Sequence, residues 1–264
     1  LGVDAVPNVT GLGTAFLRGS VFRRTVLTMY RFAFTHAKAV LFQNPDDQAL
    51  FLREGIVRPG QSRVIPGSGI DPTHFRPVEL PAEPRFLMIA RLLGDKGVRE
   101  YVAAARKLKA SFPSAGFALL GELDRQNRSA VSTGELEAWV RESVIEYVGS
   151  KRDVRPHIAR SSAVVLPSYR EGLPRTLLEG AAMARPLIGT DVPGCRELVR
   201  DGVTGFLCEA RDADSLAAAM ERLARMSHDE RMRLGTEARS MVEREFDQTL
   251  VSDAYLELLA GRAD

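Results

Sequence analysis

The feature that most constrains the fold is the regular alternation of short apolar, β-branched segments with longer segments of helical periodicity. Buried parallel strands are continuous apolar runs of this kind, and crossover helices connect them over the faces of the sheet. The pattern predicts a doubly wound α/β architecture. Strands are expected near 6–9, 39–42, 63–65, 85–89, 117–120, 145–148, 163–166, 186–189 and 205–208, and helices near 45–54, 98–111, 134–141, 154–160, 174–184, 213–226, 228–246 and 248–260.

A proline-rich segment divides the chain into two units. Five prolines and two glycines lie between residues 66 and 84, where neither a helix nor a long strand can continue. About six strands follow, enough for a complete Rossmann-like domain, whereas the first unit has too few. We therefore assign 1–76 to the remainder of a first domain with its linker, 77–246 to a complete domain, and 247–264 to a helix packing back on the first. We expect a fragment, because the chain begins with Leu1 rather than a methionine and leads directly into the expected strand 6–9.

Composition and charge exclude several classes of protein. With 45% hydrophobic and 27% charged residues, the 264-residue chain has the composition of a folded globular protein. Its apolar runs fall short of the roughly 20 residues that cross a bilayer. Cys195 and Cys208 have no metal-ligand spacing, which indicates a reducing compartment and a cytoplasmic protein. With a net charge of only +2, we expect no nucleic-acid partner.

A basic segment near the start is the exception to this even charge distribution. Between Arg18 and Lys38 there are five cations and no acid, interleaved with large apolar side chains. A basic amphipathic helix of this kind can lie on an anionic membrane surface, so residues 14–38 are candidates for a peripheral contact at the inner face of the cell membrane. The alternative is a half-buried helix with solvated arginines.

The strongest constellation for chemistry runs from Ser168 to Glu179. It follows an expected buried strand and leads into a helix, with Pro174 expected in the first helical turn. In an open α/β sheet, ligands bind at such strand-to-helix loops. The amides of Gly172 and Leu173 could bind an anion at the helix start, and we expect the missing side chain of Gly172 to let a diphosphate approach closely.

Two carboxylates in this constellation have different expected roles. On a continuous helix, Glu171 and Glu179 would lie roughly 12 Å apart, too far for the pair of a retaining glycosidase. Glu179, on the helix, suits a ribose diol, and Glu171, in the loop, faces the sugar. The alternative is that both are solvated charges of a helix start and a helix surface.

An ordered series of motifs resembles the retaining glycosyltransferases of family 4, which have the two-Rossmann-domain GT-B fold. The resemblance runs from about Gly11 to the chain end and includes the two glutamates eight residues apart. It implies a complete C-terminal donor domain and a partial N-terminal acceptor domain. The other motifs are Pro167-Ser168, Ala182-Met183, Pro186, Asp191-Val192-Pro193-Gly194, Glu197, Asp201-Gly202, Gly205-Phe206 and Ile89-Ala90-Arg91-Leu92-Leu93-Gly94-Asp95-Lys96-Gly97.

The last of these motifs is the loop in which, by the resemblance, Arg91 and Lys96 grip the donor diphosphate. A nucleoside diphosphate carries about two to three negative charges, so cations are needed to hold it. Arg91 can fork onto its oxygens, and Lys96 adds a point charge that stabilises the leaving group. We expect neither a metal nor another cofactor, since the nucleotide sugar is itself the substrate.

The resemblance adds further positions of the site. Glu171, Arg91 and Lys96 are expected to be catalytic, and Gly11, Leu12 and Gly13 to border the acceptor. The two aspartates at 212 and 214 are expected to cap a helix rather than bind metal. The expected donor-binding residues are Ser168, Gly172, Leu173, Pro174, Arg175, Glu179, Gly121, Gly149, Ser150 and Arg152.

The function expected from these motifs is transfer of a hexose or N-acetylhexosamine from a UDP-sugar, with retention, to a saccharide acceptor. Motifs similar to those of bacterial capsule, O-antigen and lipid-linked oligosaccharide enzymes imply an undecaprenyl-diphosphate-linked acceptor. Two alternatives stay open: a UDP-sugar-binding fragment without turnover, and a sugar-nucleotide epimerase of the same fold.

Overall fold

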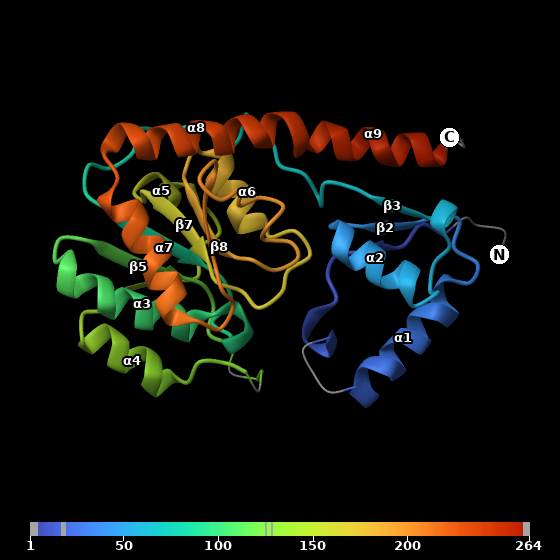
Figure 1. Ribbon diagram of the computed structural model, residues 1–264, viewed down its shortest axis with the longest axis horizontal. Helices are drawn as coiled ribbons and strands as arrows, with labels where there is room; N and C mark the ends of the chain where they lie inside the picture. Colours follow the sequence, from blue (N-terminus) through green and yellow to red (C-terminus); the bar gives the residue numbers. More distant parts are fainter. Residues whose placement is uncertain (1–4, 17–19, 125, 128, 261–264) are drawn as a thin grey trace.

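A computed structural model describes residues 5–16, 20–124, 126, 127 and 129–260, whose named strands form two parallel sheets (Figure 1). The first sheet has the order β1-β2-β3, and the second has the order β6-β5-β4-β7-β8-β9. The predicted α/β fold is confirmed, and the predicted strand ends agree to within two residues. The strands are β1 (Asn8–Val9), β2 (Val40–Phe42), β3 (Ser62–Val64), β4 (Arg85–Ile89), β5 (Gly116–Leu120), β6 (Glu146–Gly149), β7 (Ala163–Leu166), β8 (Leu187–Thr190) and β9 (Gly205–Cys208).

Helices cover both faces of the larger sheet (Figure 1). Because side chains alternate along a strand, Phe86 and Met88 of β4 pack into one apolar cluster, and Leu87 and Ile89 pack into the other. The first cluster contains residues of α3 (Val98–Ser111), α4 (Thr133–Arg141) and α7 (Ala213–Arg225), and the second contains residues of α5 (Arg155–Ala159), α6 (Arg175–Ala182) and α8 (His228–Glu245).

Side-chain caps set where several of these helices begin. In α4 and α8, a serine before the helix and a glutamate three residues later form reciprocal capping boxes, at Ser132 and at Ser227. Before α7, the Asp212 carboxylate accepts hydrogen bonds from the amides of Asp214 and Ser215. The expected capping role of Asp212 is therefore confirmed.

The first unit packs its small sheet between helices on two sides. On one side, α1 (Ser20–Phe34) and α2 (Pro45–Arg53) pack on Val40 and Phe42. On the other, α9 (Gln248–Leu259) reaches across from the second unit and buries Val251, Ala254 and Leu258 against the sheet (Figure 1). The Tyr255 hydroxyl of α9 accepts a hydrogen bond of 2.9 Å from the Asn8 side chain. Two 3-10 helices, η1 (Gly13–Phe16) and η2 (Pro59–Gln61), complete this unit.

Arginines of the second unit hold the proline-rich linker. Proline has no amide to donate, but the carbonyl oxygens of such a segment still need donors. Arg185, Arg231 and Arg239 supply them, and Arg185 is completely buried. Burial lowers the pKa of Arg185 to about 10. The carbonyl acceptors are Val78 and Glu79 for Arg185, Ala82 for Arg231, and Pro72 and Phe75 for Arg239.

Candidate active site

The loops that follow β4 and β7 meet at the carboxyl edge of the larger sheet, because the two strands are direct neighbours. The β4 loop forms a short 3-10 helix, η3 (Gly94–Lys96), and then passes through Gly97 with φ 73°. A Cβ atom at Gly97 would lie 2.1 Å from the carbonyl oxygen of Pro167. Glycine at this position therefore allows the two loops to touch.

Contact between these loops brings Lys96 and Glu171 together. The Nζ atom of Lys96 lies 2.5 Å from Oε1 of Glu171, and the two side chains are 21% and 13% exposed. Limited access to water strengthens this ion pair relative to one on the surface. The sequence predicted both residues for the site, and the structure brings them into direct contact.

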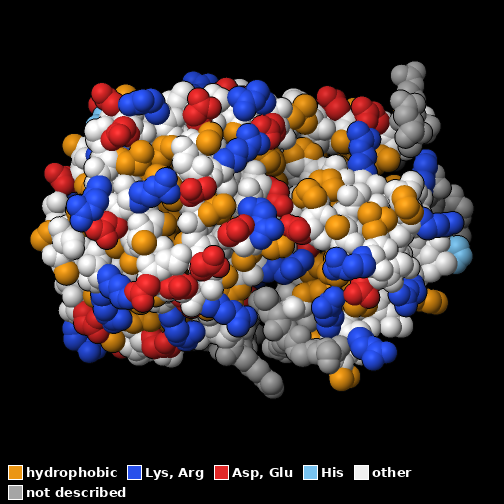
Figure 2. Space-filling model, viewed as in Figure 1, with side chains coloured by type: hydrophobic (Ala, Val, Ile, Leu, Met, Phe, Trp, Pro, Cys, Tyr) orange, Lys and Arg blue, Asp and Glu red, His pale blue; other side chains and the backbone are white. Residues whose placement is uncertain are grey.

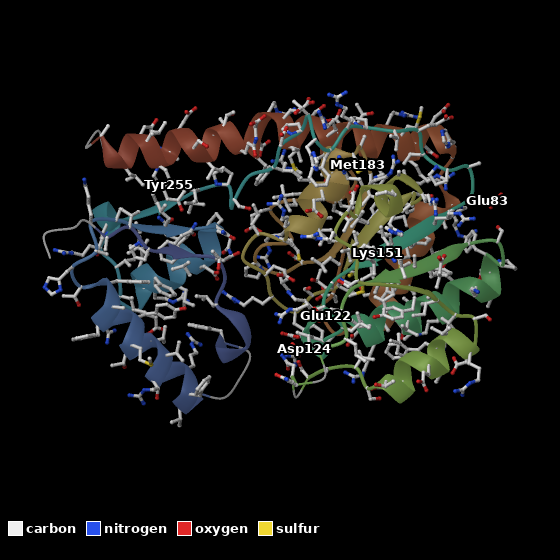
Figure 3. The ribbon with its side chains drawn as sticks, turned by 180° about the vertical axis from the view of Figure 1, so that it is seen from behind. Glu83, Glu122, Asp124, Lys151, Met183 and Tyr255 are labelled. Carbon is white, nitrogen blue, oxygen red and sulfur yellow. The ribbon has the colours of Figure 1, made fainter. Side chains whose placement is uncertain are left out.

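Arg91, which was expected to hold a diphosphate together with Lys96, has a different ion-pair partner from Lys96. Its side chain is 60% exposed and, among the described residues, forms an ion pair with Asp124 at 3.6 Å. The reason is that the Leu92 amide donates to the Glu122 carbonyl, which ties this part of the β4 loop to the loop after β5. Figure 3 shows Glu122 and Asp124 on the side of the second unit nearest the first unit.

Glu179 lies on α6 with its side chain only 11% exposed. Burial raises the pKa of this carboxyl, and the charge of Arg175, whose Nε donates to Glu179 Oε1 at 3.0 Å, opposes the rise. The two residues are one helical turn apart, and Arg175 is more than half exposed. A buried carboxylate therefore lies one turn into this helix, and its cationic partner is the exposed first residue of the helix.

The segment between β7 and α6 differs from expectation at Pro174. Pro174 was expected in the first turn of the helix, but it is the residue before the helix, with φ −74° and ψ 112°. Its carbonyl oxygen accepts from the amides of Leu177 and Leu178. Ser168 is completely buried, and its Oγ has no hydrogen-bond partner among the described residues.

Gly172 is packed against the first unit, a role that the sequence analysis did not predict. A Cβ atom there would lie 1.9 Å from the Thr10 carbonyl oxygen and 3.1 Å from the Gln43 side chain. The missing side chain of Gly172 therefore lets the two units approach each other. Within the part of the chain that the structure describes, the amides of Gly172 and Leu173 donate no hydrogen bond.

Contacts across this interface include residues to which the sequence analysis gave no role. Arg170 forms an ion pair with Asp47 of α2, whose side chain is fully buried. The Asn44 side chain donates to the Gly172 carbonyl oxygen at 2.8 Å. Burial raises the pKa of the Asp47 carboxyl, and Arg170 and Asn44 oppose that rise. Asn44 and Pro45 can be recognised in the sequence as a helix start. The neighbouring residues do not indicate, however, that Asn44 and Asp47 contact a loop more than 120 residues away.

The glycines after β5 and β6 are linked to each other. The Gly121 amide donates to the Gly149 carbonyl oxygen at 3.1 Å, and a Cβ atom at Gly121 would lie 1.7 Å from the Ala90 carbonyl oxygen. Gly121 therefore has a packing role. Gly149 has open space around it, and Ser150 and Arg152 are exposed at the same edge of the sheet.

The segment expected to border the acceptor lies directly at the interface between the units. A Cβ atom at Gly11 would lie 3.1 Å from the Gly172 amide nitrogen. The Leu12 side chain is 4% exposed and belongs to the core of the first unit. Gly13 begins η1 with φ 59°.

Helix α1 carries an unusual share of the exposed apolar side chains. Leu27 and Phe34 are buried, but Val21, Phe22, Met29 and Phe32 are between 51% and 87% exposed. Figure 2 shows hydrophobic side chains beside Lys and Arg over this part of the first unit. Of the expected basic residues, Arg18 lies outside the described residues. Arg23 and Arg31 both contact Glu54, and Arg24 is exposed.

The described residues contain neither a cluster of metal ligands nor a membrane-spanning helix. Across residues 5–260, apart from the undescribed gaps, no three His, Cys, Asp or Glu side chains are grouped as metal ligands would be. None of the helices in the described ranges combines the length and apolar character needed to cross a membrane.

Comparison with known proteins identifies relatives along most of the chain. The model of the family described as "Glycosyl transferases group 1" matches residues 83–226. A Campylobacter jejuni N,N'-diacetylbacillosaminyl-diphospho-undecaprenol alpha-1,3-N-acetylgalactosaminyltransferase is 28% identical over 95% of this chain and 68% of its own length. The amylovoran biosynthesis glycosyltransferase AmsK of Erwinia amylovora is 29% identical over 66% of this chain. The chain spans about half the length of further relatives, and 44% of AmsK.

A solved structure agrees with the fold. Anabaena HepE, in complex with UDP-glucose, matches 98% of this chain and 72% of its own with a TM-score of 0.83, at 18% identity.

Proposed function

Because the chain belongs to the group 1 glycosyl transferases, we propose that it transfers a hexose or N-acetylhexosamine from a UDP-sugar to a saccharide acceptor, with retention at the anomeric carbon. The observation that carries this proposal is the ion pair between Lys96 and Glu171, at the carboxyl edge of the larger sheet and next to the start of α6. Parallel α/β sheets bind nucleotides at this edge.

Each group of the site has a part in the reaction. When the bond from the anomeric carbon to the diphosphate breaks, its electron pair goes to a diphosphate oxygen, and Lys96 stabilises that charge. The acceptor hydroxyl forms the new bond on the same face of the sugar and loses its proton to the departing diphosphate. Glu171 orients the sugar, Glu179 binds the ribose, and the unpaired amides of Gly172 and Leu173 bind phosphate oxygens.

The proposal includes a reaction without a metal ion. Lys96, the exposed Arg91 and the start of α6 supply the positive charge that a diphosphate requires. Activity after treatment with EDTA and gel filtration is expected to equal that of the untreated protein. A loss of activity that Mg²⁺ or Mn²⁺ restores would contradict this part of the proposal.

The proposed acceptor is an undecaprenyl-diphosphate-linked saccharide, handled on the cytoplasmic side of a membrane. The name of the Campylobacter jejuni relative specifies an acceptor of this kind for that protein. In this chain, α1 has no acidic residue and exposes Phe22, Met29 and Phe32 beside the exposed Arg24. An apolar surface with a cationic border suits an anionic bilayer.

Co-sedimentation with vesicles tests the membrane contact. We expect binding to vesicles that contain phosphatidylglycerol, weaker binding to phosphatidylcholine alone, and weaker binding after Phe32→Ser. Val140→Ser is the matched control, because Val140 is also an exposed apolar residue but lies on α4 of the second unit. Equal binding of both variants and of the unchanged chain would contradict the contact.

A turnover assay separates the proposed function from its alternatives. Release of UDP from a UDP-sugar only when a lipid-linked saccharide is present supports transfer. Interconversion of the UDP-sugar without acceptor would indicate an epimerase. Binding of UDP by calorimetry without either reaction would indicate a fragment that binds the donor and does not turn it over.

A further inference from the structure

Both residues that flank Glu171 are held by the first unit. On one side, Arg170 forms an ion pair with the Asp47 carboxylate. On the other, the Gly172 carbonyl oxygen accepts a hydrogen bond of 2.8 Å from the Asn44 side chain. Glu171, which contacts Lys96 of the second unit, therefore lies between two anchor points of the first unit.

The two anchors on the first unit form one small network at the start of α2. Asn44 Oδ1 accepts from the Asp47 amide at 2.8 Å, and Asn44 Nδ2 lies 3.2 Å from the Asp47 carboxylate. Both residues are fully buried. Polar groups in such surroundings are bound strongly and are costly to leave unpaired, so the network resists separation of the units.

A second ion pair across the same interface provides a comparison. Arg196 lies 3.5 Å from Asp46, and both side chains are more than 40% exposed. Exposed pairs of this kind contribute little, because water screens them and long side chains lose entropy when they are held. Of these two adjacent aspartates, only Asp47 has the buried position that a positioning role requires.

We propose that Asn44 and Asp47 are positioning residues that place the Glu171 loop for the reaction only while the two units are in contact. The inference rests on the proposed function and deepens it. The acceptor is expected on the first unit and the donor on the second. Contact between the units therefore brings the two substrates together, and through the network the same contact places Glu171 for the reaction. Glu171 is the residue that contacts the donor. Asn44 and Asp47 affect the reaction only by positioning Glu171.

This role predicts separate effects on turnover and on donor affinity. Lys96 and Glu179, which would hold the nucleotide, lie on the second unit and, among the described residues, pair with Glu171 and Arg175 rather than with Asn44 or Asp47. We expect Asp47→Asn to lower kcat by about tenfold to a hundredfold, since small misplacements of reacting groups have effects of this size. The Kd for UDP is expected to change by less than about threefold.

The experiment combines kinetics with hydrogen exchange in the same chain. In Asp47→Asn, we expect the hydrogen-bonded amides of Tyr169 and Glu171 to exchange about tenfold faster than in the unchanged chain, because this loop has lost an anchor. Asp46→Asn is the matched control and should leave both exchange and kcat nearly unchanged. Unchanged exchange in Asp47→Asn would overturn the network, and faster exchange with unchanged kcat would overturn the positioning role.

A double variant separates positioning from stability. Asp47→Asn alone leaves the Arg170 charge uncompensated, whereas Asp47→Asn combined with Arg170→Gln removes both charges. We expect the double variant to recover thermal stability but to remain slow, and recovery of kcat together with stability would overturn the inference. If the unchanged chain shows no turnover with any acceptor, the proposed function fails, and the exchange measurement still decides whether the anchor exists.

Discussion

The Nζ atom of Lys96 lies 2.5 Å from Oε1 of Glu171, although 75 residues separate the two along the chain. The contact exists because β4 and β7 are neighbours and both loops leave the same edge of the sheet. In the proposed function, the cation binds a phosphate and the carboxylate accepts hydrogen bonds from sugar hydroxyls.

Replacement of Lys96 by methionine keeps the length of the side chain and removes its charge. We expect the rate of UDP release to fall by about a hundredfold or more, as for the loss of one preorganised electrostatic group in other enzymes. Lys107→Met is the control, because Lys107 is an exposed residue of α3 whose partner is Asp214. A Lys96→Met chain with half of the original rate would exclude a role for this charge.

Glu179→Gln is expected to change stability in a pH-dependent way. Burial raises the pKa of the Glu179 carboxyl group in the folded chain. In the unfolded chain this carboxyl titrates near about 4.3, so the folded chain keeps the carboxyl proton to a higher pH. The contribution of Glu179 to stability is therefore greatest below that value and falls as the pH rises through the folded-state pKa.

Thermal unfolding of both chains between pH 4 and pH 8 measures this effect. The Tm of Glu179→Gln relative to the unchanged chain should rise across that range, while its affinity for UDP falls by about tenfold with the loss of a charged hydrogen-bond partner. A Tm difference that does not vary with pH would show that burial does not raise the pKa of Glu179.

Arg185→Ala is expected to destabilise the protein by about 3 kcal/mol or more, because it removes a fully buried side chain and leaves four carbonyl oxygens without this donor. The side chain is fully buried and donates to the linker at Val78 and Glu79. Urea unfolding measures the change. Arg160→Ala, at an exposed position after α5, should shift the free energy of unfolding by less than about 0.5 kcal/mol.

Gly172→Ala is expected to separate the two units. The new Cβ atom would lie 1.9 Å from the Thr10 carbonyl oxygen, so the backbones have to move apart. Small-angle scattering should show a larger radius of gyration, and the rate of transfer should fall. Gly134→Ala, in α4 with open space around it, should raise stability by up to about 1 kcal/mol and leave the scattering unchanged.

Much of the fold could be predicted because strands and helix caps depend on residues that are close together in the sequence. Apolar runs predicted each strand of the larger sheet to within one residue at either end, and Asp212 was correctly predicted as a cap. Pro174 was misplaced by one position, since proline is compatible both with the residue before a helix and with its first turn. The proline-rich segment was also visible, but the arginines that bind it were not, because a buried arginine has no local signature.

The amino-acid sequence by itself determined the two Rossmann-like units, the loops that carry Lys96, Glu171 and Glu179, and the membership of a family that uses such loops. These follow from periodicity and from the rule that parallel strands end at one edge. Only the tertiary structure decided that Arg91 pairs with Asp124, that Gly172 meets Thr10, and that Asn44 and Asp47 flank the Glu171 loop. The Arg91 contact depends on which loops of the larger sheet lie side by side, and the other contacts depend on how the two units approach each other. Neither local propensity nor residue spacing encodes that geometry.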